Sequence, residues 1–162
     1  MLTRRDGLRV AMAALCIGVA AVSCPAWAQD AGQADAPRLA LNGYDPVAYF
    51  TEGRPELGKA EFEYTWDEAR YRFASEEHLS MFRDDPDRYA PQYAGLCTMG
   101  MSKGKKVEAN PENWLISDGR LFVFNPSDGP ARFQADPQTA EAAADRNWEQ
   151  LKDAPVGAVL PQ

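Results

Sequence analysis

The pair Asp118-Gly119 lies between two runs of strand-forming residues, and this arrangement constrains the fold more than any other feature of the chain. An Asp-Gly pair suits the type I′ turn, which joins two antiparallel strands through two residues. The sequence therefore predicts a β-hairpin with strands at residues 114–117 and 120–124.

A second hairpin is predicted at residues 62–73. Phe62, Tyr64 and Trp66 alternate with polar residues, and Tyr71 and Phe73 resume the alternation after an interruption by Asp-Glu-Ala. Alternation with a period of two is typical of strands and places these aromatic side chains on one face of the hairpin.

Two helices are predicted from their capping residues. Ser75 precedes two glutamates, whose charges suit a helix N-terminus, and this helix should end at residues 84–86, Asp-Asp-Pro. Asp136 and Pro137 begin a last helix, which should run to about Lys152. The sequence shows no internal repeat. We therefore expect an α+β fold with two β-hairpins and two to three helices.

The first 28 residues have the charged, apolar and small-residue order of an export signal. Three arginines precede an apolar run at residues 10–22, which is shorter than the roughly 20 residues that span a bilayer. We therefore expect the following organisation: a cleaved signal at 1–28, a flexible spacer at 29–38, one domain at 39–153 and a loose tail at 154–162.

Two features of the signal bear on the export route. Arg4 and Arg5 stand together before the apolar run, so both the twin-arginine and the general secretory routes are open. Residues 21–24, Ala-Val-Ser-Cys, loosely resemble a lipoprotein cleavage site, but a weak first residue and a following proline favour ordinary cleavage. The mature protein is expected to be periplasmic or secreted.

Cleavage would leave Cys97 as the only cysteine of the 134 remaining residues, because Cys16 and Cys24 lie in the signal. An internal disulfide is then excluded, and Cys97 is buried and inert, a metal ligand, or a reactive or dimer-forming thiol. The mature chain carries a net charge of −9, since three basic residues and one acidic residue leave with the signal. Such a charge argues against nucleic acid or an anionic membrane as partner.

Several short motifs follow one another between residues 39 and 125. They are Gly-Tyr-Asp-Pro-Val-Ala-Tyr-Phe at 43–50, Tyr-Arg-Phe-Ala-Ser at 71–75, His78, Phe82, Asp85-Pro86, Tyr89, and Pro-Gln-Tyr-Ala-Gly-Leu-Cys at 91–97. In this order and spacing they resemble the YHS domain family. The resemblance implies a small α+β domain, found alone in exported bacterial proteins and fused to metal-handling chains.

The chain departs from the metal-binding members of that family. The resemblance implies cysteines at three positions that hold Asp45, Ala74 and His78 here. Asp45 and His78 can still donate oxygen and nitrogen to a metal, whereas Ala74 has no donor. The segment Gly95-Leu96-Cys97 matches the stand-alone exported subgroup, whose function the resemblance leaves open.

Cys97, Met99 and Met101 form a candidate soft-metal site. In an extended segment alternate side chains share a face, and one thiol with two thioethers would favour Cu(I). His78 and Met81, one helical turn apart, could add a nitrogen and a third thioether. The same alternation also suits a core strand, because free cysteine and methionine are commonly buried.

Three hypotheses for function follow. The first is a metal-handling or binding accessory that holds Cu(I) or another transition metal, with Asp45 as a further ligand. The second is a metal-free module that binds a partner protein or small ligand, and the third is a thiol enzyme using Cys97. Motifs of known hydrolases such as Gly-x-Ser-x-Gly are absent from the sequence, and His78 is its only histidine.

Overall fold

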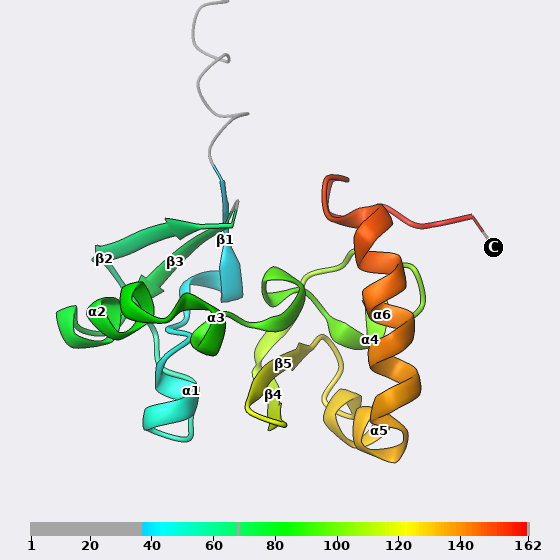
Figure 1. Ribbon diagram of the computed structural model, residues 1–162, viewed down its shortest axis with the longest axis horizontal. Coiled ribbons are helices and arrows are strands. Elements are labelled where there is room, and N and C mark those ends of the chain that lie inside the picture. Colours follow the sequence, from blue (N-terminus) through cyan, green and yellow to red (C-terminus); the bar gives the residue numbers. More distant parts are fainter. Residues whose placement is uncertain (1–36, 68, 162) are drawn as a thin grey trace, which may run out of the picture. The chain divides into compact units, whose positions relative to one another are not determined.

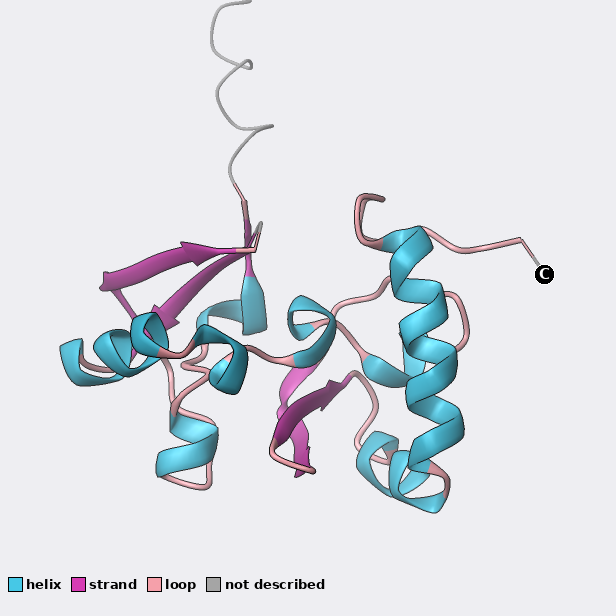
Figure 2. Ribbon diagram, viewed as in Figure 1, coloured by secondary structure: helices cyan, strands magenta, loops and turns pink. Residues whose placement is uncertain are grey.

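The computed structural model describes residues 37–67 and 69–161, so the predicted signal and most of the predicted spacer lie outside the described residues. Its elements, in chain order, are β1 (Arg38–Leu39), η1 (Ala40–Gly43), α1 (Ala48–Thr51), β2 (Lys59–Trp66), β3 (Ala69–Phe73), α2 (Glu76–Asp84), α3 (Pro86–Tyr89), η2 (Gln92–Gly95), α4 (Thr98–Met101), β4 (Asn110–Ser117), β5 (Arg120–Phe124), α5 (Gly129–Ala135) and α6 (Pro137–Leu151). The fold is α+β, as predicted, with sheets ordered β1-β3-β2 and β4-β5 (Figure 1, Figure 2).

Hairpin β4–β5 confirms the prediction made from the Asp-Gly pair. Both turn residues have positive φ, 49° at Asp118 and 74° at Gly119, as a type I′ turn requires. The two strands pair antiparallel. Strand β4 begins at Asn110, upstream of the predicted start at Trp114, because pairing continues across a register shift between these two residues.

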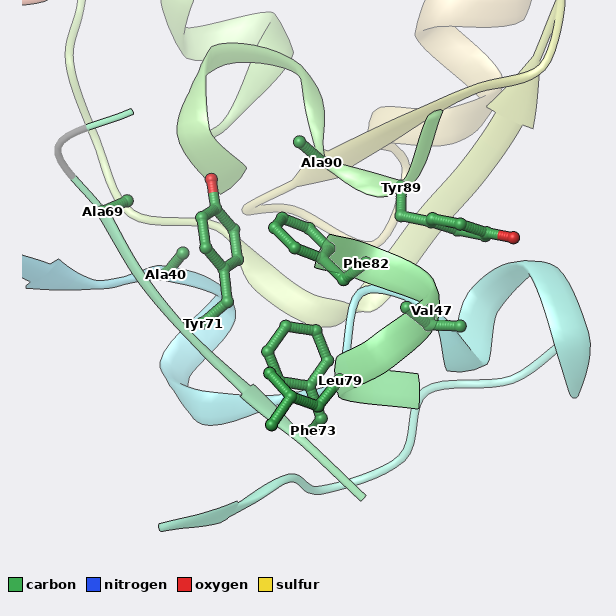
Figure 3. Packing of buried hydrophobic residues seen from close by; sticks show 9 residues of the cluster. All are labelled: Ala40, Val47, Ala69, Tyr71, Phe73, Leu79, Phe82, Tyr89 and Ala90. Atoms are coloured by element: carbon green, nitrogen blue, oxygen red, sulfur yellow. The ribbon is translucent and has the colours of Figure 1, made fainter. Parts of the chain in front are cut away.

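Hairpin β2–β3 is also confirmed, and its aromatic face packs on α2. Phe82 of α2 lies with its ring centroid 5.0 Å from that of Tyr71 and 5.1 Å from that of Phe73. Figure 3 shows the buried residues of this first cluster: Ala40, Val47, Ala69, Tyr71, Phe73, Leu79, Phe82, Tyr89 and Ala90. Burial of these side chains is what holds hairpin and helix together.

Both predicted helices are present. Ser75 Oγ accepts a hydrogen bond from the backbone N–H of His78 at the start of α2, and Asp136 caps α6 through the N–H of Thr139. Four further helices, α1, α3, α4 and α5, have only four to seven residues. Such helices are too short for a helical period to be recognised in the sequence. No helix in the described ranges is both long and apolar enough to cross a membrane.

The two hairpins share one register. Every cross-strand pair of β2–β3 recurs in β4–β5 at a displacement of 51 positions, so that Tyr64↔Tyr71 corresponds to Leu115↔Phe122. The register shift recurs at the equivalent place. The ring of Phe133 on α5 packs on β5 as that of Phe82 on α2 packs on β3.

Equivalent turns precede the two hairpins. Leu41 in η1 and Tyr93 in η2 have φ of 52° and 54°, and in each turn the next residue is also left-handed. Gly43 and Gly95 complete the turns with φ of 86° and 76°, where the absence of a Cβ atom is an advantage. We call residues 40–85 the first repeat and residues 92–136 the second repeat.

The expectation of no internal repeat is therefore wrong. Identical residues are few and lie mostly at turn, cap and core positions, such as Phe73 and Phe124 or Asp85-Pro86 and Asp136-Pro137. The remaining positions differ because each repeat faces different surroundings. The similarity thus lies in register and dihedral angles, which become visible only in the folded chain.

Two further clusters complete the core. The second cluster belongs to the second repeat and α6, and contains Tyr93, Leu96, Met101, Phe122, Phe124, Phe133, Ala140, Ala144 and Leu151. The third cluster joins the repeats and contains Leu41, Tyr49, Cys97, Ala109, Leu121 and Val123. Because the third cluster draws on both repeats, neither repeat is a separate domain.

The C-terminal residues are not the loose tail that the sequence predicts. The N–H of Leu160 donates to the carbonyl of Gly104 at 2.8 Å, and the N–H of Lys106 donates to that of Ala158 at 2.9 Å. Ala158 and Leu160 also pack against the second cluster. Two irregular segments thus satisfy each other's backbone groups, a pairing that sequence patterns do not reveal.

Candidate functional site

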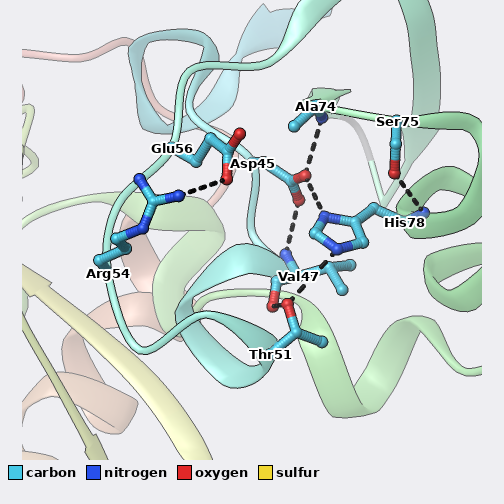
Figure 4. Close-up of polar contacts among 8 residues, drawn as sticks. All are labelled: Asp45, Val47, Thr51, Arg54, Glu56, Ala74, Ser75 and His78. Atoms are coloured by element: carbon cyan, nitrogen blue, oxygen red, sulfur yellow. Dashed lines mark hydrogen bonds and ion pairs between the residues drawn. The ribbon is translucent and has the colours of Figure 1, made fainter.

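Asp45, directly after η1 and Tyr44, has a fully buried carboxylate. Its Oδ1 accepts from the N–H of Val47 at 2.8 Å, and its Oδ2 accepts from the N–H of Ala74 at 2.8 Å (Figure 4). His78 Nδ1 lies 2.6 Å from the same Oδ2. A carboxylate can be buried at tolerable cost only with such partners, and Asp45 thereby links η1 to the start of α2.

His78 connects this carboxylate to the molecular surface. With its proton on Nδ1, toward Asp45, the neutral imidazole has an acceptor lone pair on Nε2. Nε2 lies 3.4 Å from Oγ1 of Thr51, an exposed residue at the end of α1. The hydroxyl proton of Thr51 can go to Nε2 or to the carbonyl of Val47, 3.2 Å away. A buried carboxylate, an imidazole and a surface hydroxyl therefore form one chain.

The three positions that the YHS resemblance identifies lie together. Asp45 contacts both the N–H of Ala74 and the imidazole of His78. Here the two candidate ligands bond to each other. Met81, the predicted helical neighbour of His78, is partly buried against the first cluster.

The buried tyrosines Tyr49, which lies near Asp45, and Tyr71 are structural. Burial raises the pKa of Tyr49 well above its ordinary value, with the carboxylate of Glu112 adding to the effect, and Tyr49 donates to the carbonyl of Pro111 at 3.0 Å. Burial likewise raises the pKa of Tyr71. Both phenols therefore stay protonated at neutral pH.

The predicted common face of Cys97, Met99 and Met101 is wrong. Residues 98–101 form helix α4, so their side chains do not alternate as in a strand. Cys97 packs in the third cluster with Leu121, whereas Met101 packs in the second cluster with Phe122. Neighbouring residues of β5 point to opposite faces, and the two sulfur atoms lie on different sides of that strand. Met99 is partly buried against both clusters.

Cys97 occupies the place in the second repeat that Asp45 has in the first. Its Sγ accepts from the N–H of Gly100 at 3.3 Å and of Asn125 at 3.2 Å, and Asn125 is the equivalent of Ala74. The side chain is 2% exposed. A buried thiol of this kind suits core packing, because a reactive cysteine needs access to solvent.

A cavity of about 610 Å³ lies between β1, η2 and the C-terminal end of α6. Its lining comes from chain segments far apart in sequence: Arg38, Asp67, Ala69, Ala94, Leu96, Lys106, Trp148, Lys152, Asp153, Ala154, Pro155 and Val156. Lys106 is 6% exposed, and its Nζ donates to the carbonyls of Lys152 and Ala154 at 2.6 Å. Sequence patterns gave no signal for this cavity, because each segment contributes only a few residues.

Comparison with known proteins adds no relative: no family model, no curated protein and no solved structure matches the chain. Within residues 37–67 and 69–161, no three His, Cys, Asp or Glu side chains are grouped so as to hold a metal ion.

Proposed function

We propose that the chain is an exported accessory protein, similar to YHS domains, that binds a small ligand in the cavity beside Trp148. The observation that carries this proposal is the cavity of about 610 Å³. Small-molecule sites typically enclose about 300–1,000 Å³ and combine apolar walls with a few polar groups. One wall is supplied by α6 and the residues after it, which lie outside both repeats.

The lining favours a small anion with a flat apolar part. Trp148 offers an aromatic surface on which a ring can stack. Arg38 and Lys152 have side chains that are 23% and 45% exposed, and both line the cavity. Asp67 and Asp153 also line it and can accept from a hydroxyl group of the ligand. The lining has three basic side chains and two acidic ones, on a chain of net charge −7. Arg38 also pairs with Glu108 and Lys152 with Glu149, so an anionic ligand would share these cations with the two glutamates.

Anilinonaphthalene sulfonate, an aromatic anion, is a suitable probe. We expect its fluorescence to rise on binding to the mature protein, and Lys152→Gln to weaken binding about 3-fold by removing one charge. Trp148→Leu should weaken binding about 10-fold through loss of the stacking surface. Lys103→Gln, the same change outside the cavity, is the matched control. Equal affinity in all four proteins would contradict the proposal.

Metal handling is the second candidate, and the contact between Asp45 and His78 supports it. Metal-ligating histidines commonly donate their other N–H to a carboxylate, which is the arrangement of His78 Nδ1 and Asp45. A Cu(I) titration against a colorimetric competitor tests this candidate. Binding lost in His78→Asn would place the metal at Nε2, and binding lost in Cys97→Ser would support the sulfur site. Absence of competition by the wild type would remove both.

Export is proposed from residues 1–28 alone, which lie outside the described residues. Expression of the full chain in a bacterium should yield a periplasmic or secreted protein that begins at Gln29. N-terminal sequencing and cell fractionation measure this directly. A lipidated N-terminus at Cys24 would establish the lipoprotein alternative, and an uncleaved cytoplasmic chain would contradict export.

A further inference from the structure

The second repeat shows which part of the Asp45 site the fold requires. In the first repeat Asp45 accepts from the N–H of Ala74, and in the second Cys97 Sγ accepts from the N–H of Asn125. A carboxylate and a thiol thus serve the same structural purpose. The repeated motif needs only an acceptor at this place.

The second repeat has no counterpart of the imidazole. Gly129 lies 51 positions after His78, the displacement that relates the two hairpins. A Cβ atom on Gly129 would lie 2.4 Å from Cβ of Phe124, so no side chain fits there. The motif therefore folds without a histidine, and the link from Asp45 through His78 to Thr51 is particular to the first repeat.

We propose that Thr51, His78 and Asp45 form a catalytic relay in which Thr51 Oγ1 is a nucleophile toward carboxylic esters. Asp45 Oδ2 lies 2.6 Å from His78 Nδ1, and His78 Nε2 lies 3.4 Å from Thr51 Oγ1. A nucleophile within reach of a base, which a third group orients, is the arrangement that activates serine and threonine hydroxyls. Asp45 is a positioning residue that holds the imidazole with its proton on Nδ1.

The reaction balances with water as the only co-reactant. Oγ1 of Thr51 attacks the ester carbonyl carbon while its proton passes to His78 Nε2. The bond between the carbonyl carbon and the alcohol oxygen then breaks, and the proton passes from Nε2 to the leaving alcohol. Water attacks the resulting threonine ester with His78 as base, which releases a carboxylic acid and restores the hydroxyl.

The position of Thr51 indicates the substrate class. Thr51 is exposed, and it does not line the cavity of the proposed ligand site. An ester would therefore approach from solvent, which suits short acyl groups, either free or displayed on a larger molecule. The inference does not depend on the proposed ligand cavity, because the two sites share no residue. It excludes a metal at His78 Nε2, because this nitrogen cannot act as a base while its lone pair ligates a metal.

Acetylation by p-nitrophenyl acetate tests the relay on the mature protein. The release of p-nitrophenol is followed by absorbance, and the acetylated residue is located by peptide mass spectrometry. We expect acetylation at Thr51, reduced about 100-fold in His78→Asn, which removes the base but keeps a donor toward Asp45. Thr51→Val should abolish it. Thr65→Val, the same change at an exposed threonine of β2, should leave it unchanged.

Three outcomes would overturn the proposal: no acetylation of Thr51 above that of Thr65, an undiminished rate in His78→Asn, or an acetyl group on His78 in place of Thr51. Thr51→Val changes an exposed side chain and keeps the result interpretable if His78→Asn is unstable. A denaturant titration of each variant separates loss of the relay from loss of the fold.

Discussion

Hairpins β2–β3 and β4–β5 share a register, and each packs one face on a helix, α2 or α5. They differ in the residues on the opposite face. In β2–β3 that face carries Glu63, which pairs with Arg70 at 3.1 Å and with Arg72 at 3.0 Å. The equivalent positions in β4–β5 hold Trp114, Leu121 and Val123, which pack in or against the third cluster. One backbone thus supports a one-sided, partly solvated hairpin and a hairpin whose second strand, β5, is buried on both faces.

The Asp45 and Cys97 sites differ in the same way. Both side chains accept a backbone N–H at the equivalent place, but Asp45 leads through His78 to an exposed hydroxyl, whereas Cys97 ends in the third cluster. The first repeat therefore presents polar groups to solvent, and the second repeat uses the equivalent positions for packing. Chemistry on the surface is expected from the first repeat only.

Labelling of the Cys97 thiol gives the largest expected effect. Because the side chain is 2% exposed, an aromatic disulfide reagent should reach it only when the structure opens. We expect labelling to be roughly 5,000-fold slower in the native protein than in denaturant, given typical opening free energies of about 5 kcal/mol. Rapid native labelling, measured by absorbance at neutral pH, would instead favour the thiol-enzyme hypothesis.

Truncation of the two equivalent core phenylalanines should have the second largest effect. Phe82→Ala removes a buried ring that packs on four strand aromatics, and Phe133→Ala removes one that packs on two. Each should cost about 3–5 kcal/mol in unfolding free energy. Both variants should still unfold in one transition, because the third cluster joins the repeats. Two separate transitions by circular dichroism and fluorescence would show that the repeats are independent.

Removal of the two equivalent acceptors should destabilise the protein by different amounts. Asp45→Ala leaves two backbone N–H groups and the His78 imidazole without their acceptor, which should cost about 3 kcal/mol. Cys97→Ala should cost about 1 kcal/mol, because a thiol is a weak acceptor and the cavity left is small. Denaturant unfolding measures the free energy of unfolding of both variants. An equal loss of stability would contradict the difference between the Asp45 and Cys97 sites.

The smallest expected effect is on the acid side of the stability profile. The hydrogen bond from Arg72, aided by Arg70, holds the pKa of Glu63 below its ordinary value. The folded state therefore favours the ionised carboxylate, and this stabilisation is present at neutral pH and is lost as the pH falls through the lowered pKa. Glu63→Gln should cost roughly 0.5 kcal/mol at neutral pH and nothing in strong acid. A pH-independent difference would contradict this assignment.

Much of the local structure could be predicted from sequence, because its signals are local. Asp118-Gly119 specified a turn through positive φ, and Ser75 and Asp136 specified helix starts through their side-chain oxygens. Alternation at Phe62, Tyr64 and Trp66 indicated a strand with one aromatic face. In each case the relevant interaction spans only a few residues, so one short stretch of chain contains all the information.

The candidate site was only half predictable. The motifs identified Asp45 and His78, but nothing in their neighbourhood connected them to Thr51, which reaches His78 from another helix. Cys97, Met99 and Met101 had the alternation of a strand, yet residues 98–101 form a helix beside β5. A period of two over five residues does not fix the backbone when packing against a strand favours another conformation.

The sequence by itself determined the hairpins, the helix caps and the α+β class, through turn chemistry, capping and alternation. The tertiary structure decided which sulfur and oxygen atoms lie together, how the C-terminal residues pair with the loop at 104–106, and where a cavity forms. It also revealed the two repeats, whose similarity resides in register and dihedral angles. Contacts between distant segments depend on how all elements pack at once, and no short stretch of sequence contains that information.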